Sequence, residues 1–180
     1  KLMIKYKTLI IISTKSDLIL RDFSLIEELS KITYVNIACT ITTMDESLRA
    51  KLEPDGCSSK RRFEVLKKFK KTNASVGVHL MPIIPYITDN YENIEEIYRL
   101  ASEIKVDYVL PGTLYLRGKT KPYFLNFIKH YNDEIYNKIS NLYIKGSAVI
   151  EYKNDLYKKV NEIKNKYNVS SNYMKPIKKN

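Results

Sequence analysis

The chain has 180 residues, 44% of them hydrophobic, and carries 31 Lys or Arg against 20 Asp or Glu, a formal net charge of +11. This composition suits one globular domain with a hydrophobic core, and it excludes disordered, collagen-like and low-complexity classes. No apolar run approaches the ~20 residues that a membrane-spanning helix needs. We therefore expect no membrane partner.

The first residues give no targeting signal. The chain does not begin with Met, and residues 1–7 lack the basic, apolar and small-residue order of a secretory signal. We expect a piece of a longer gene product. Cys39 and Cys57 belong to no C-x-x-C pair and to no His/Cys cluster with ligand spacing. The sequence thus predicts neither a disulfide framework nor a metal site, and a cytoplasmic location is the default.

Four short apolar runs recur, each followed by a polar turn and a segment of helical period. They are Lys7–Ser13, Tyr34–Thr40, Ser75–Met81 and Val106–Leu110. Three are rich in β-branched residues and nearly continuous, which is typical of strands covered on both faces. Strand and helix alternate every 30 to 40 residues, roughly the length of a βα unit. We therefore predict an α/β fold with four parallel strands.

Capping patterns mark the starts of the intervening helices. They lie at 24–27 (Ser to Glu), 43–46 (Thr to Glu) and 89–92 (Asp to Glu). Ser59 opens a further helix, Lys60–Lys71, with seven basic residues and one acidic residue. Most of its charges should form a solvated face, but Arg62, near the helix start, is placed to turn inward and bind a carboxylate.

From Pro122 onward the apolar spacing becomes helical and predicts C-terminal helices, one of them within 147–168. Residues 169–180 are mostly polar and predict a flexible tail. Residues 145–180 hold nine basic and three acidic side chains, an excess that attracts anionic partners such as DNA. An A/T-rich genome would also give this lysine-rich composition, so the charge alone does not decide the partner.

Parallel βα units bind ligands in the loops that follow the strands. In the first loop Lys15 can pair with a carboxylate or phosphate, or it is solvated beside a turn made by Ser16 and Asp17. In the second loop, the hydroxyls of residues 40, 42 and 43 can contact a sugar or cap the next helix. The third loop, 82–85, is apolar with two prolines. It suits a flat ligand such as adenine, or simply the end of a buried strand.

No catalytic set can be assembled from the spacing. His79 lies in a predicted strand and His130 on a predicted helix, and neither has a partner at catalytic or ligand distance along the chain. The sequence shows no Ser-His-Asp set, no glycine-rich phosphate loop and no paired carboxylates. The residues alone therefore predict a parallel α/β domain with an anion-binding rim.

Five segments, read together, resemble the second half of radical S-adenosylmethionine (radical SAM) enzymes. The nearest branch is that of the DNA repair photolyases, which are related to spore photoproduct lyase. The segments are Thr14–Asp22, Thr40–Asp45, Leu52–Pro54, Arg62, and Pro82–Pro85 with Thr88–Asp89. Each motif is weak alone, but their order is specific. The resemblance runs from about Lys5 to Gly118 and more loosely to about Gly146.

The resemblance implies a partial TIM-type (βα) barrel in residues 1–146. In the family, a [4Fe-4S] cluster cleaves S-adenosylmethionine to a 5′-deoxyadenosyl radical, and three cysteines in a C-x-x-x-C-x-x-C loop hold the cluster. This chain lacks that loop, since its four strands correspond to the family's strands three to six. The resemblance therefore implies that the cluster ligands lie on polypeptide outside this chain.

The resemblance also implies roles for individual residues. Lys15 matches the lysine that faces the cofactor's carboxylate, Thr40 a residue that faces the ribose, and Arg62 an arginine near the methionyl group. The stretch beside adenine matches Met81, Pro82 and Ile83. The loop hydroxyls of Ser16 and Thr42 complete the predicted cofactor-binding set.

Four parallel strands cannot close a barrel, so a sheet edge and its apolar inner face should lie open. The missing N-terminal part of the same protein, a partner copy or the C-terminal helices would cover them, and we favour the first. The predicted function is the C-terminal portion of a radical SAM enzyme, inactive alone. The alternative is a non-catalytic basic module that binds nucleic acid or a protein; a generic phosphate-sugar binder is a third reading.

Overall fold

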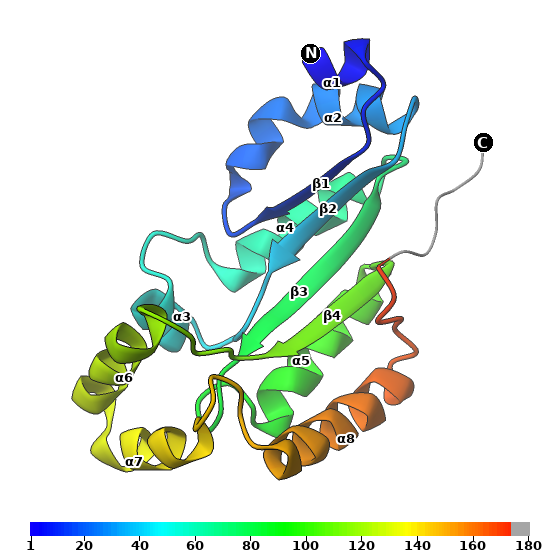
Figure 1. The fold of residues 1–180 in the computed structure, drawn as a ribbon. Helices are drawn as coiled ribbons and strands as arrows, with labels where there is room; N and C mark the ends of the chain where they lie inside the picture. The colour runs from blue at the N-terminus through cyan, green and yellow to red at the C-terminus, as the bar shows by residue number, and fades with distance from the viewer. Residues whose placement is uncertain (174–180) are drawn as a thin grey trace.

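A four-stranded parallel sheet forms the centre of the computed structural model, which describes residues 1–173 (Figure 1). The strands, in both chain and sheet order, are β1 (Ile10–Thr14), β2 (Val35–Thr40), β3 (Ser75–Ile83) and β4 (Tyr108–Thr113). Each neighbouring pair is parallel. The predicted α/β class with four parallel strands is confirmed, with boundaries displaced by up to three residues.

Helices join and flank the strands. They are α1 (Leu2–Lys5), the 3-10 helix η1 (Asp17–Asp22), α2 (Phe23–Ser30), α3 (Glu46–Leu52), α4 (Ser59–Phe69), α5 (Tyr91–Glu103), α6 (Thr120–Tyr131), α7 (Asp133–Leu142) and α8 (Ile150–Lys166). Three predicted caps were wrong by one or two positions, because Asp22, Asp45 and Asn90 stand at the helix starts. The Asp45 and Asn90 side chains accept backbone N–H groups there, which satisfies donors that a helix leaves open.

The main hydrophobic core lies between the sheet and one layer of helices. Alternate strand residues such as Ile37, Val78 and Val109 point into it and are fully buried. Helices α2, α4 and α5 supply the opposite side, and α8 packs beside α5 (Figure 1). Because α8 contributes Leu156 and Val160 to the same core, it is part of this domain and not a separate unit.

The other face of the sheet is mixed, where the sequence predicted an open apolar surface. Ile11, the register partner of Asn36, exposes apolar surface on this face, but a row of polar side chains crosses the rest of it. The Tyr108 ring lies over Gly77, and its hydroxyl donates to Asn36 Oδ1 at 2.8 Å. The same hydroxyl lies 3.3 Å from His79 Nε2, and His79 Nδ1 lies 3.0 Å from Ser13 Oγ. Side chains of all four strands are thus linked across this face.

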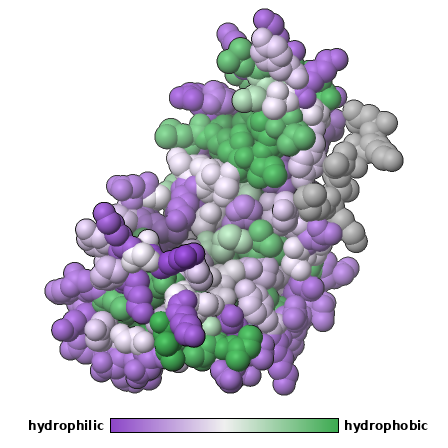
Figure 2. Space-filling view, in the orientation of Figure 1, coloured by the Kyte–Doolittle hydropathy of each residue, from purple (hydrophilic) through white to green (hydrophobic). Residues whose placement is uncertain are grey.

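The two edges of the sheet differ. At β4 the Val109 N–H donates to the Ser170 carbonyl at 2.8 Å, and Val169 is buried. The predicted flexible tail at 169–180 therefore begins packed against the sheet, because its backbone pairs with the edge; residues 174–180 lie outside the described residues. At β1, Ile11 is 53% exposed, and Leu9, just before the strand, is 63% exposed. Figure 2 shows an apolar patch on this face of the molecule.

Within residues 1–173, no helix combines the length and apolar character that crossing a bilayer requires.

Gly77 is the position where packing on the open face is tightest. A Cβ at this position would lie 2.1 Å from the Tyr108 ring, so Gly77→Ala should lower the free energy of unfolding by about 1–3 kcal/mol. Urea denaturation measures this change. In a Tyr108→Ala background the same substitution should cost far less, since the obstructing ring is gone. Equal costs in both backgrounds would contradict this packing.

Candidate binding site at the carboxyl ends of the strands

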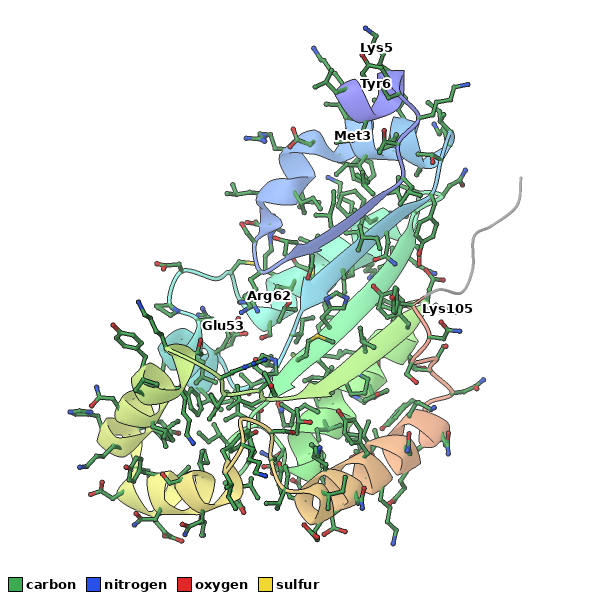
Figure 3. All side chains as sticks on the ribbon, in the orientation of Figure 1. Met3, Lys5, Tyr6, Glu53, Arg62 and Lys105 are labelled. Atoms are coloured by element: carbon green, nitrogen blue, oxygen red, sulfur yellow. The ribbon has the colours of Figure 1, made fainter. Side chains whose placement is uncertain are left out.

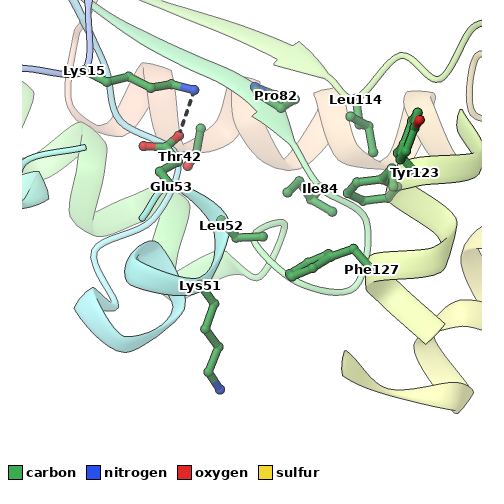
Figure 4. A pocket seen from close by; sticks show the side chains of 11 residues that line it. Lys15, Thr42, Lys51, Leu52, Glu53, Pro82, Ile84, Leu114, Tyr123 and Phe127 are labelled. Carbon is green, nitrogen blue, oxygen red and sulfur yellow. Dashed lines mark ion pairs between the residues drawn. The ribbon is translucent and has the colours of Figure 1, made fainter. Parts of the chain in front are cut away.

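A cavity of about 340 Å³ lies where the strands end (Figure 4). It is lined by Lys15, Thr42, Lys51, Leu52, Glu53, Pro82, Ile84, Leu114, Tyr123, Phe124 and Phe127. They come from the loops after the strands, from the last residues of β3, from α3 and the residue that follows it, and from α6. Its size falls within the ~300–1,000 Å³ of small-molecule sites, and apolar walls with a few charged groups are typical of them.

A second cavity of about 280 Å³ adjoins the first. It is lined by Lys15, Ser16, Leu52, Glu53, Pro54, Asp55 and Gly56. Because Lys15, Leu52 and Glu53 line both cavities, these three residues form the wall between them.

Glu53 pairs with two cations at this wall. Its Oε1 lies 3.1 Å from Lys15 Nζ, and its Oε2 lies 2.5 Å from Arg62 Nη1. The Lys15 side chain is 46% exposed, that of Glu53 10%, and that of Arg62 is fully buried. Figure 3 shows Arg62 and Glu53 together between α4 and α3. The cluster carries two positive charges and one negative charge, so it retains a net charge of +1.

Arg62 is fixed by several acceptors. Its Nε donates to the Cys57 carbonyl at 2.9 Å and its Nη1 to the Thr40 carbonyl at 2.8 Å. Its Nη2 is buried, has no hydrogen-bond partner among residues 1–173, and lies 2.4 Å from where a Gly56 Cβ would stand. The predicted inward turn of Arg62 toward a carboxylate is confirmed. That carboxylate is Glu53 of the same chain.

The structure brings only part of the predicted cofactor set together. Lys15, Thr42 and Pro82 line the larger cavity. Ser16 lines the smaller one, but its hydroxyl already accepts the Leu18 N–H at the start of η1.

Four of the predicted positions line neither cavity. They are Thr40, Met81, Ile83 and the buried Arg62. Thr40 is buried, and Met81 lies against Gly112. Ile83 belongs to the core on the helix side, because the strand register shifts between Leu80 and Ile83 and turns its side chain away.

Several residues of this region escaped the sequence analysis. Tyr123, Phe124 and Phe127 line the cavity from α6, where the sequence pattern predicted a helix but no ligand site. His79 and Ser13 pair although 66 residues separate them, which no spacing rule detects. Burial lowers the pKa of His79 and raises the pKa of Tyr108 to about 12, so both are neutral near pH 7.

The cysteines do not fit an iron-sulfur cluster. Burial raises the pKa of the Cys39 thiol to about 12, whereas a cluster ligand must be a thiolate. The Cys57 thiol donates to the Lys15 carbonyl at 3.4 Å. Across residues 1–173, no three His, Cys, Asp or Glu side chains gather as metal ligands would. This part of the chain offers no ligand set for a cluster.

The chain resembles proteins longer than itself, and no family model matches it. An uncharacterized protein of Acidianus two-tailed virus is 33% identical over 116 residues, which cover 63% of this chain and 38% of that protein. An uncharacterized protein of Methanocaldococcus jannaschii is 27% identical over 167 residues, covering 86% and 53%. One of Mycobacterium tuberculosis is 24% identical over 135 residues, covering 75% and 40%. The chain thus spans between 38% and 53% of the length of these relatives.

Arg62 should contribute far more than Arg61 to the free energy of unfolding. Arg62→Leu leaves the Glu53 carboxylate without its buried partner, so we expect a loss of about 3–5 kcal/mol in the free energy of unfolding. Arg61→Leu is the matched control, because Arg61 forms exposed ion pairs with Asp17 and Glu64, and it should change stability little. Denaturation curves of similar midpoint for the two variants would refute the role given to Arg62.

Proposed function

We propose that the chain is the C-terminal portion of a radical SAM enzyme of the DNA-repair-photolyase-like branch, and that its strands form part of a TIM-type barrel. One observation carries the proposal. Lys15 and Thr42 follow β1 and β2, Pro82 lies near the end of β3, and all three line a single cavity. Barrel enzymes bind their ligands at this end of the strands.

The cavity suits the nucleoside cofactor of that family. Pro82, Ile84 and Leu114 offer an apolar wall for a flat base, and Lys15 offers a positive charge for a carboxylate. Together with a cluster, the bound cofactor would supply radical chemistry; this chain's residues would bind and orient it. The cluster ligands must come from other polypeptide, since Cys39 and Cys57 do not fit. Such a cluster needs reducing surroundings, so the proposal includes a cytoplasmic location.

We further propose that the open β1 edge pairs with a parallel strand from the rest of the same, longer protein. Leu9 and Ile11 expose apolar surface along this edge, and an uncovered edge strand is prone to pair with other chains. The greater length of the relatives supports this source for the missing strand. A dimer of the intact protein that pairs β1 with β1 would favour a partner copy instead.

Lys15→Ala, made in the intact longer protein, should weaken S-adenosylmethionine binding at least tenfold, because a charge-assisted hydrogen bond is worth about 1.5–3 kcal/mol. Iron content should not change, since the proposed cluster ligands lie elsewhere. Lys60→Ala, on the exposed surface of α4, is the control and should bind as the unaltered protein does. Unchanged affinity in Lys15→Ala would remove the assignment of this loop.

A second candidate function, nucleic-acid binding, is favoured by the surface of α6. Tyr123, Phe127 and Tyr131 are exposed at intervals of four residues, and the last two rings stack with centroids 6.2 Å apart. Lys51 Nζ lies 5.5 Å from the centre of the Tyr131 ring. Residues 117–132 include four Lys or Arg and no acidic residue. Exposed aromatic rings beside basic groups are typical of surfaces that bind single strands.

The surface of α6 supports nucleic-acid binding better than the basic C-terminal region does. Lys166 there pairs with Glu95 at 2.5 Å, and Lys159 donates to the Asp89 carbonyl. Two of the lysines are thus already engaged within the chain.

Tyr131→Ala should lower the affinity for a fluorescent single-stranded oligonucleotide by about tenfold, since stacking contributes about 1–3 kcal/mol per base. Fluorescence anisotropy at several salt concentrations measures this. Tyr6→Ala is the control, because Tyr6 is also exposed and has Lys5 Nζ 5.4 Å from its ring centre. If both variants lose affinity equally, or neither does, α6 is not a nucleic-acid surface.

A further inference from the structure

Four side chains on the open face of the sheet form a continuous chain of hydrogen bonds. Ser13 Oγ lies 3.0 Å from His79 Nδ1, and His79 Nε2 lies 3.3 Å from the Tyr108 hydroxyl. That hydroxyl donates to Asn36 Oδ1 at 2.8 Å. Figure 1 shows α4 and α5 behind the sheet, so this face is turned toward the viewer. The four residues are separate from the two strand-end cavities, since none of them lines either cavity.

The direction of these hydrogen bonds follows from Asn36. Its Nδ2 donates to two other side-chain oxygens, so its Oδ1 is left to accept. Tyr108 gives its single proton to Asn36, and its oxygen therefore accepts the proton on His79 Nε2. A neutral imidazole carries one such proton, which makes Nδ1 an acceptor. The Ser13 hydroxyl must then donate to His79.

The His79 ring is positioned to act as a base toward Ser13. Burial lowers the pKa of His79, so the ring is neutral near pH 7 and its Nδ1 can take up a proton. Tyr108, which is buried and lies over Gly77, fixes the other ring nitrogen. Ser13, in contrast, is exposed. An accessible hydroxyl that points at a base, whose far nitrogen is oriented by a third group, is the arrangement of an activated nucleophile.

We propose that Ser13 and His79 act as nucleophile and general base in acyl transfer from small esters. The inference goes beyond the proposed function and does not depend on it. Ser13 Oγ attacks the carbonyl carbon of the ester and forms a C–O bond, while its proton passes to His79 Nδ1. The bond from that carbon to the alcohol oxygen then breaks, and the departing oxygen takes the proton from His79. The products are an alcohol and acyl-Ser13.

The surroundings of Ser13 favour a neutral, apolar acyl group. Ile11 lies two residues before Ser13 on the same face of the sheet and is 53% exposed. It offers an apolar contact for the acyl chain. The linked side chains themselves are uncharged near pH 7, because His79 and Tyr108 are both neutral there. They therefore offer no charge to pair with an ionised acyl group.

The test treats the unaltered 180-residue chain with 4-nitrophenyl butyrate and locates the butyryl group by peptide mass analysis. We expect butyryl-Ser13 to form at least about 100-fold faster in the folded chain than in the urea-unfolded chain, because general-base catalysis contributes about 10²–10⁴-fold. Release of 4-nitrophenolate should show a matching burst of one equivalent. Absence of the butyryl group at Ser13, or equal rates in the folded and unfolded chains, would overturn the proposal.

Three variants separate catalysis from support of the sheet. Ser13→Ala should abolish the burst. His79→Ala should slow formation of butyryl-Ser13 about 100-fold, and added imidazole should restore part of that rate by taking the vacated place as base. Ser47→Ala is the matched control and should change nothing, since Ser47 is also exposed but its hydroxyl donates to the Asp45 carboxylate.

A folded His79→Ala variant that keeps the full rate, or that imidazole does not rescue, would show that His79 only links the strands. If that variant does not fold, the position of the butyryl group on the unaltered chain still decides. Either outcome leaves the proposed cofactor site untouched, because Lys15 and the cavity residues take no part in this reaction.

Discussion

A single carboxylate, Glu53, sets the geometry of the strand-end region. It links the loop after β1, through Lys15, to helix α4, through Arg62. Because Arg62 is fully buried, its charge requires a close partner and hydrogen-bond acceptors. Residue Cys57 and the end of β2 at Thr40 supply those acceptors from their backbones. The segment between α3 and α4 is therefore drawn over Arg62, and its first residue, Glu53, forms the wall between the two cavities together with Lys15 and Leu52.

The rest of the site depends on the parallel order of the strands. Each strand ends at the same side of the sheet, so the loops that hold Lys15 and Thr42 converge with Pro82 near the end of β3, although the three residues are far apart in sequence. Helix α6 then closes the cavity with aromatic side chains. The polar row on the open face lies on the same sheet, and Tyr108 reaches across Gly77 to hold it together. The same parallel sheet therefore positions both the residues that line the cavity and the polar row on its open face.

The spacing of apolar residues predicted the strands and most helices. Strands bury alternate residues and helices bury every third or fourth, and both patterns can be seen within a short stretch of sequence. The positions of the helix caps were predicted less well, because Asp45 and its neighbours can all accept hydrogen bonds from the same backbone N–H groups. Ile83 shows a limit of another kind. Its side chain faces the core only because the pairing of β3 with β4 shifts near it, and no pattern in β3 alone contains that shift.

The ion pairs of Glu53 could not be predicted from the sequence either, since Lys15 and Arg62 lie in other segments of the chain. The most direct test of the account is a crystal structure of the intact, longer protein with S-adenosylmethionine bound. We predict that the cofactor's carboxylate lies near Lys15, that adenine lies beside Pro82, and that a parallel strand pairs with β1. Cofactor bound away from this cavity, or an antiparallel strand along β1, would contradict it.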